Sequence, residues 1–128
     1  MYYISKTLEG VTFEEAIEKV TAELKKEGFG VLTEIDVKET LKKKIDVDFK
    51  KYRILGACNP VFAHKALTAE DKIGVFLPCN VIVEEHDNGQ VEVSAVDPVA
   101  SMMSVKNDSL GGIATEVRAK LGRVIEGV

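Results

Sequence analysis

The pattern of hydrophobic and polar positions divides the first half of the chain into strands that alternate with helices. Residues 2–8 are rich in aromatic and β-branched side chains, which is typical of a strand. Thr12 and Glu15 then have the spacing of a capping box, which predicts the start of a helix. The apolar stripe of this helix consists of Phe13, Ile17, Val20 and Leu24.

A second strand and a short helix follow. Residues 30–36 alternate as a strand does, and this predicts that Val31, Thr33 and Ile35 share one face. Asp36 and Glu39 have the spacing of another capping box, so a short Lys-rich helix should begin there. Its apolar stripe would be Val37, Leu41 and Ile45.

The central part of the chain predicts two more strands around a third helix. Residues 52–58 indicate a strand, and Asn59–Pro60 indicates the start of a helix over residues 61–67, because Asn caps helices and Pro favours their first position. Residues 73–77 predict a strand that Pro78 interrupts and that continues over residues 80–86.

The last third of the chain predicts a hairpin and a final helix. Asn88–Gly89 lies at the centre of a strong turn signal, and residues 91–96 form the expected return strand. Residues 99–105 fit either a helical turn or a loop. The final helix should be capped by Asp108 or Ser109. Its apolar stripe would be Leu110, Ile113, Ala114, Val117, Leu121 and Val124.

This order of elements predicts an α+β fold that forms one domain over residues 1–128. We expect a two-layer α/β sandwich, with a mixed, mostly antiparallel sheet and two long helices packed on one face. The other face would expose Val and Ile side chains. Because a monomer rarely exposes a large apolar face, the pattern predicts a homodimer.

Composition and charge narrow the function classes. The chain has 128 residues, 45% hydrophobic and 30% charged, with a formal net charge of −4, which excludes a disordered or disulfide-dense protein. The mild acidity and the few basic clusters argue against a nucleic-acid partner. The sequence shows no signal peptide and no apolar stretch long enough to cross a membrane, so we expect a cytoplasmic protein.

The chemistry of the chain centres on a repeated element, since no familiar catalytic motif occurs. Cys58–Asn59–Pro60 and Pro78–Cys79–Asn80 each place a thiol beside an amide and a proline. Cys58 precedes a predicted helix N-terminus, where the helix dipole favours a thiolate. If the two strands are neighbours, both thiols could belong to one site. The alternative is two independent buried cysteines, each beside an asparagine that caps a turn.

Carboxylates and one histidine are candidates for the same place. Glu34 and Asp36 end one predicted strand and Asp97 ends another, so Asp36, Cys58 and Asp97 could converge at one sheet edge. Asp36 is also explained as a helix cap and Asp97 as a turn starter. His64 could complete a zinc site with Cys58 and Cys79, although the spacing matches no structural zinc motif.

Four stretches of the chain resemble the domain-of-unknown-function 302 family. They are residues 28–37, 55–60, 77–81 and 97–98, and the most specific elements are Cys-Asn-Pro and Leu-Pro-Cys-Asn. The resemblance implies a small α/β sandwich similar to TATA-binding-protein-like folds, a tendency to dimerise and no established activity. It also implies a set of recurrent residues, namely Glu34, Asp36, Cys58, Asn59, Pro60, Pro78, Cys79 and Asn80.

Three hypotheses about function follow. The first is a homodimeric binding module for a small molecule or a metal that uses the two Cys-Asn elements. The second is a thiol-dependent enzyme or a redox-active protein that uses Cys58, and the third is a purely structural dimer. For the binding module, the candidate ligand-binding residues are Glu34, Asp36, Cys58, Asn59, Cys79, Asn80 and Asp97.

Overall fold

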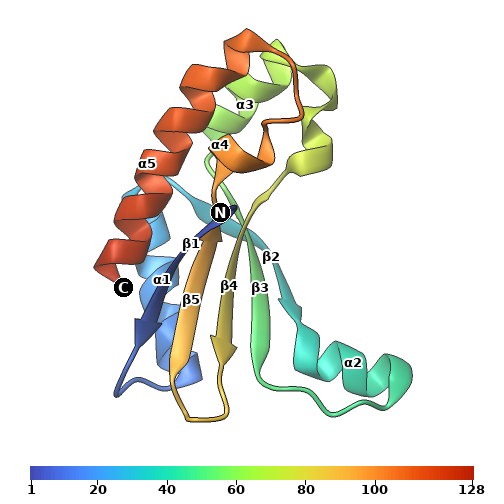
Figure 1. The fold of residues 1–128 in the computed structure, drawn as a ribbon, viewed down its shortest axis with the longest axis vertical. Helices are drawn as coiled ribbons and strands as arrows, with labels where there is room; N and C mark the ends of the chain where they lie inside the picture. The colour runs from blue at the N-terminus through green and yellow to red at the C-terminus, as the bar shows by residue number, and fades with distance from the viewer.

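Five strands form one sheet in the computed structural model, which describes residues 1–128 (Figure 1). The spatial order is β1-β5-β4-β3-β2, and every pair of neighbours is antiparallel. This confirms the predicted α+β class and makes the sheet antiparallel throughout. The strands are β1 (Tyr3–Leu8), β2 (Gly30–Asp36), β3 (Tyr52–Cys58), β4 (Cys79–Glu85) and β5 (Val91–Val96).

Two long helices, α1 (Phe13–Lys26) and α5 (Gly111–Gly127), cover one face of the sheet. The predicted capping box of α1 is present, because Glu15 N–H donates to Thr12 Oγ1 and Thr12 N–H donates to Glu15 Oε1. The apolar side of α1 contributes Val20 and Leu24 to the core, and α5 contributes Leu121 and Val124. Alternate residues of the central strands meet them, namely Leu55, Ala57, Val81, Val83, Val91, Val93 and Ala95.

Short helices gather at the end of the sheet where β3 finishes and β4 begins. They are α3 (Pro60–Ala69), the 3-10 helix η1 (Asp71–Phe76), α4 (Pro98–Ser101) and the 3-10 turn η2 (Asp108–Leu110). Asn59 caps α3 as predicted, whereas the cap before η2 is Asn107 rather than Asp108 or Ser109. α5 begins directly after this turn without a side-chain cap, because η2 already supplies its first turn.

The prediction of a strand over residues 73–77 is wrong, because most of this segment is the 3-10 helix η1. In a strand, Ile73 and Val75 would share one face. Here Ile73 is 1% exposed and packs with Ala66 and Leu110, while Val75 is 82% exposed. In a 3-10 helix the side chains of Ile73 and Val75 point in different directions. The short apolar run of residues 73–77 does not by itself distinguish a strand from a helix.

The prediction that Val31, Thr33 and Ile35 share one face of β2 is wrong for Val31. A β-bulge lies between Val31 and Thr33, so Val31 pairs with Ala57 on the helix-covered side while Thr33 pairs with Gly56 on the other side. The helix α2 (Val37–Ile45) does begin at the Asp36 cap, but none of its residues is buried. It projects from the lower end of β2 and β3 (Figure 1). In its apolar stripe, Val37 and Leu41 are only partly buried and Ile45 is exposed.

The other face of the sheet, called the open face here, carries no helix (Figure 1). One row of side chains crosses it from β2 to β4, because Ile35 pairs with Ile54 and Ile54 with Ile82. The row continues through Ser94 and Ser5 on β5 and β1. The expected apolar surface is therefore a stripe of isoleucines rather than a whole sheet face. No helix has both the length and the apolar character that crossing a bilayer requires.

Replacing Leu24 by Ala should lower the free energy of unfolding by about 2–5 kcal/mol, because Leu24 is fully buried where α1 meets the sheet. Leu32→Ala is the matched control, since Leu32 is 68% exposed. It should cost less than about 1 kcal/mol. Urea denaturation measures both variants, and equal losses would contradict the core position of Leu24.

Candidate functional site

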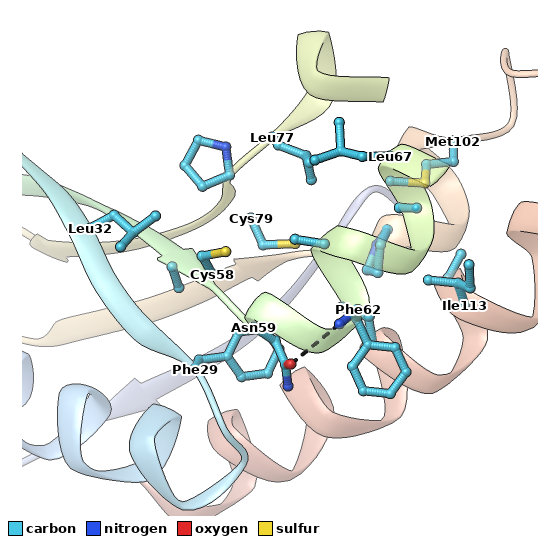
Figure 2. A pocket seen from close by; sticks show the side chains of 17 residues that line it. Phe29, Leu32, Cys58, Asn59, Phe62, Leu67, Leu77, Cys79, Met102 and Ile113 are labelled. Atoms are coloured by element: carbon cyan, nitrogen blue, oxygen red, sulfur yellow. Dashed lines mark hydrogen bonds between the residues drawn. The ribbon is translucent and has the colours of Figure 1, made fainter. Parts of the chain in front are cut away.

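A largely apolar pocket lies at the end of the sheet where the short helices gather. It has a volume of about 320 Å³ and is lined by 17 residues, of which 14 are hydrophobic. The end of β3 and the start of β4 form its floor, and α3 and α5 form two of its walls (Figure 2). No Asp, Glu, Lys, Arg or His lines it, so the cysteine thiols are its only titratable groups.

Aromatic and aliphatic side chains build the walls. Phe29 comes from the turn between α1 and β2, Phe62 and Leu67 come from α3, and Ile113 comes from α5. Met102 closes the pocket beside α4, whereas Met103 is 79% exposed and does not line it. These residues come from segments far apart in the sequence, and such a surface excludes charged groups more effectively than apolar ones.

Both cysteines line this pocket (Figure 2). β3 and β4 are neighbours, and Cys79 pairs directly with Ala57, the residue before Cys58. The two thiols are free and each residue is half-buried. The structure thus brings Cys58 and Cys79 to one place, while a ligand shared by both stays a prediction.

Burial raises the pKa of the Cys79 thiol to about 11, and the neighbouring Cys58 contributes to the increase. Removal of water disfavours the charged thiolate, so Cys79 is a neutral thiol at physiological pH. A neutral thiol behaves as a small polarisable apolar group and is a poor nucleophile.

Gly56 gives Pro78 its place beside the pocket. A β-carbon at Gly56 would collide with Thr33 Oγ1 and would lie 2.8 Å from Pro78 Cγ. Only glycine therefore lets Pro78 and Thr33 approach β3 this closely on the side opposite the long helices. Pro78 in turn leads directly into Cys79, so Gly56 contributes to the position of the thiol.

Asn59 has a structural role that occupies its amide. Its Nδ2 donates to the carbonyl oxygen of Glu27 at 3.2 Å, and its Oδ1 accepts from Phe62 N–H at 3.5 Å. These bonds fasten the end of α1 to the start of α3. Asn59 lines the pocket, but its polar atoms point to the backbone rather than to a free ligand position (Figure 2).

Asp97 lies at the same end of the sheet as Cys58, because β3 and β5 run in the same direction and both terminate there. Its carboxylate caps α4 by accepting from Val99 N–H at 3.0 Å, and it also accepts from Arg118 Nε at 2.8 Å. Both oxygens are thus engaged. Asp97 does not line the pocket, although the following Pro98 does.

The expectation that Asp36 converges with Cys58 is wrong. β2 and β3 are antiparallel, so Asp36 pairs with Arg53 while Cys58 pairs with Gly30 at the opposite end. Glu34 and Asp36 both form ion pairs with Arg53. Strand ends meet at one edge only when the strands run in the same direction, and here they do not.

Two other candidates lie outside the pocket. Asn80 follows Cys79, so it faces the opposite side of the sheet and lines a second hollow on the open face. His64 is exposed on α3 and does not line the pocket. The three proposed zinc ligands Cys58, Cys79 and His64 are therefore not brought together around it.

Comparisons with known proteins agree with this fold. The family model described as "Domain of unknown function DUF302" matches residues 4–128. The chain belongs to the DUF302 family. It is similar to a solved structure, the crystal structure of an uncharacterized conserved DUF302 protein from Bacillus stearothermophilus. The two chains share 29% identity with a TM-score of 0.91, over 98% of this chain and 97% of the other. No curated protein matches the sequence.

The family match confirms the resemblance carried by the two Cys-Asn elements, and the antiparallel sheet with its helices is the fold that the DUF302 neighbour shares. What sequence reasoning missed is the apolar pocket around these elements. No local pattern in the sequence marks its lining residues, which include Phe29, Phe62, Leu67 and Leu77, because local patterns do not distinguish a cavity wall from a filled core.

Alkylation of Cys79 by iodoacetamide should be slow and strongly dependent on pH. In a Cys58→Ala variant, which leaves a single thiol, the rate at pH 8 should be at least about tenfold below that of free cysteine, because burial, the main cause of the raised pKa, remains when Cys58 is removed. The rate should rise about tenfold for each pH unit between 8 and 10. A rate that levels off below pH 9 would contradict the burial of this thiol.

Proposed function

We propose that this protein is a binding module whose pocket takes a small, uncharged, apolar molecule. The observation that carries the proposal is the lining of the pocket, in which 14 of 17 residues are hydrophobic and none except cysteine is ionisable. Its volume of about 320 Å³ is within the range of small-molecule sites. A molecule of two or three fused rings, or a short branched chain, fits this size.

The polar groups at the pocket also favour an uncharged ligand. The amide of Asn59 is engaged with Glu27 and Phe62, and Cys79 is protonated at neutral pH. A charged ligand would lose its hydration without gaining a partner. The cost would resemble that of burying an unpaired ion, which is at least several kcal/mol. The two thiols offer instead a polarisable surface for an aromatic ring.

A thiol-dependent enzyme is less well supported. Such an enzyme needs a base or an activated thiolate beside the nucleophile. The thiol of this hypothesis is Cys58, and the pocket that it lines contains no histidine or carboxylate to serve as a base. Binding rather than catalysis is therefore the function that the described side chains favour.

Aminoanthracene, an uncharged dye that becomes fluorescent in apolar surroundings, tests this proposal. The protein should increase its fluorescence in a saturable manner at one site per chain. Ala63 lines the pocket, so Ala63→Phe should fill part of it and weaken binding about tenfold or more, which corresponds to about 1.4 kcal/mol. The dye should also slow the alkylation of Cys58 and Cys79.

The matched control is Ala119→Phe, because Ala119 is exposed on α5 and does not line the pocket. This variant should bind the dye like the parent protein, and circular dichroism should show that both variants are folded. Equal affinities for the two variants, or no saturable binding by the parent protein, would refute the proposed pocket function.

We also propose that two copies of the chain associate through the open face. Ile35, Ile54 and Ile82 form a continuous apolar row there, and Ile35 is 47% exposed. Polar side chains, including Ser94 and Asn80, flank the row. An apolar centre with a polar rim is the composition of many protein interfaces, and a twofold axis through one such patch lets it cover itself.

Sedimentation velocity at micromolar concentration tests this association, with the mass of a dimer as the expected result. Ile54→Glu places a charge in the centre of the row and should shift the protein to the monomer. Val75→Glu is the control, since Val75 is exposed on η1 away from this face, and it should leave the dimer intact. A monomeric parent protein would refute the association.

A further inference from the structure

The hairpin between β4 and β5 carries a group of nitrogen and oxygen donors that the pocket does not use. Glu84 and Glu92 are directly paired across the two strands, and His86 follows two residues after Glu84. One donor atom from each of Glu84, His86 and Glu92 lies within 4.8 Å of the other two. All three residues are half-buried.

Neighbouring side chains already orient this group. His86 Nε2 and Glu92 Oε1 are 2.8 Å apart, and the Ser5 hydroxyl donates to Glu92 Oε2. Ser94 Oγ in turn donates to Ser5 Oγ at 3.1 Å. Hydrogen bonds of this kind behind a set of ligands hold carboxylates and imidazoles in place for a metal.

Glu84 and Glu92 give this group two carboxylates that a bound cation would neutralise. Two carboxylates directly opposite each other on paired strands repel one another and destabilise the hairpin. Lys50 Nζ lies 2.6 Å from Glu84 Oε1 and offsets one of the two negative charges. Glu92 has no lysine or arginine partner at salt-bridge distance, and its ion-pair partner is His86.

Open space lies beside these ligands. Glu84 and Glu92 line a hollow of about 440 Å³ on the open face, together with Tyr3 and Tyr52. A metal held by three protein side chains at the wall of such a hollow keeps coordination positions for water or a further ligand.

We propose that Glu84, His86 and Glu92 bind one divalent transition-metal ion, with Zn²⁺ as the best match. One imidazole nitrogen and two carboxylate oxygens suit Zn²⁺ better than Mg²⁺ or Ca²⁺, which prefer oxygen alone. The site is independent of the apolar pocket, which lies at the opposite end of β4.

Isothermal titration of the full chain with ZnCl₂ tests the site. We expect one ion per chain and a saturable binding curve. Glu92→Gln and His86→Asn should each weaken Zn²⁺ binding about tenfold or more. Glu85→Gln is the matched control, because Glu85 pairs with Val91 on the other side of the sheet, and it should bind like the parent protein.

A variant with Cys58→Ala and Cys79→Ala distinguishes this site from binding by the thiols. It should keep the single Zn²⁺ and should also keep the effect of Glu92→Gln. Loss of Zn²⁺ binding in the double cysteine variant, or parental affinity in both Glu92→Gln and His86→Asn, would overturn the proposal. So would the absence of any Zn²⁺ binding by the parent protein at millimolar concentration, whatever the outcome of the dye experiment.

Discussion

The packing of α1 and α5 against one face of the sheet is the contact on which both ends of the molecule depend. Leu24 and Leu121 are fully buried against Leu55, Val81 and their neighbours in one continuous core. This core holds β3 and β4 side by side and sets the direction of α5, whose first turns extend beyond the end of the sheet as a wall of the pocket. Burial of apolar surface thus supports the strand pairing that places the two cysteines near each other.

Antiparallel pairing decides which chemistry-bearing residues meet. β3 and β5 terminate at the same end of the sheet, so Cys58 and Asp97 lie there. β2 terminates at the opposite end, where Asp36 lies. The same pairing brings Glu84 opposite Glu92 within one hairpin. Antiparallel pairing therefore keeps Asp36 away from the thiols, and it brings together a different acidic pair, Glu84 and Glu92, at a distance from them.

The polar side chains around the pocket hold the structure together and leave the cavity wall apolar. Asn59 joins two helices, and Asp97 caps a third while it pairs with Arg118. Buried polar groups need partners, and backbone groups supply most of them here. What faces the cavity is therefore mostly carbon and sulfur, which supports the proposal that the pocket takes an uncharged ligand.

The sequence by itself determined the elements whose signals are local. The capping box at Thr12, the cap at Asn59 and the Asn88–Gly89 turn each depend on bonds between residues close along the chain, and the repeated Cys-Asn elements carried the family resemblance. Tertiary structure decided what depends on distant partners. It turned most of residues 73–77 into a 3-10 helix, because Ala66 and Leu110 cover Ile73, and it left α2 without a buried residue. The pocket belongs to this second kind, since its walls come from segments that only the packing of the core brings together.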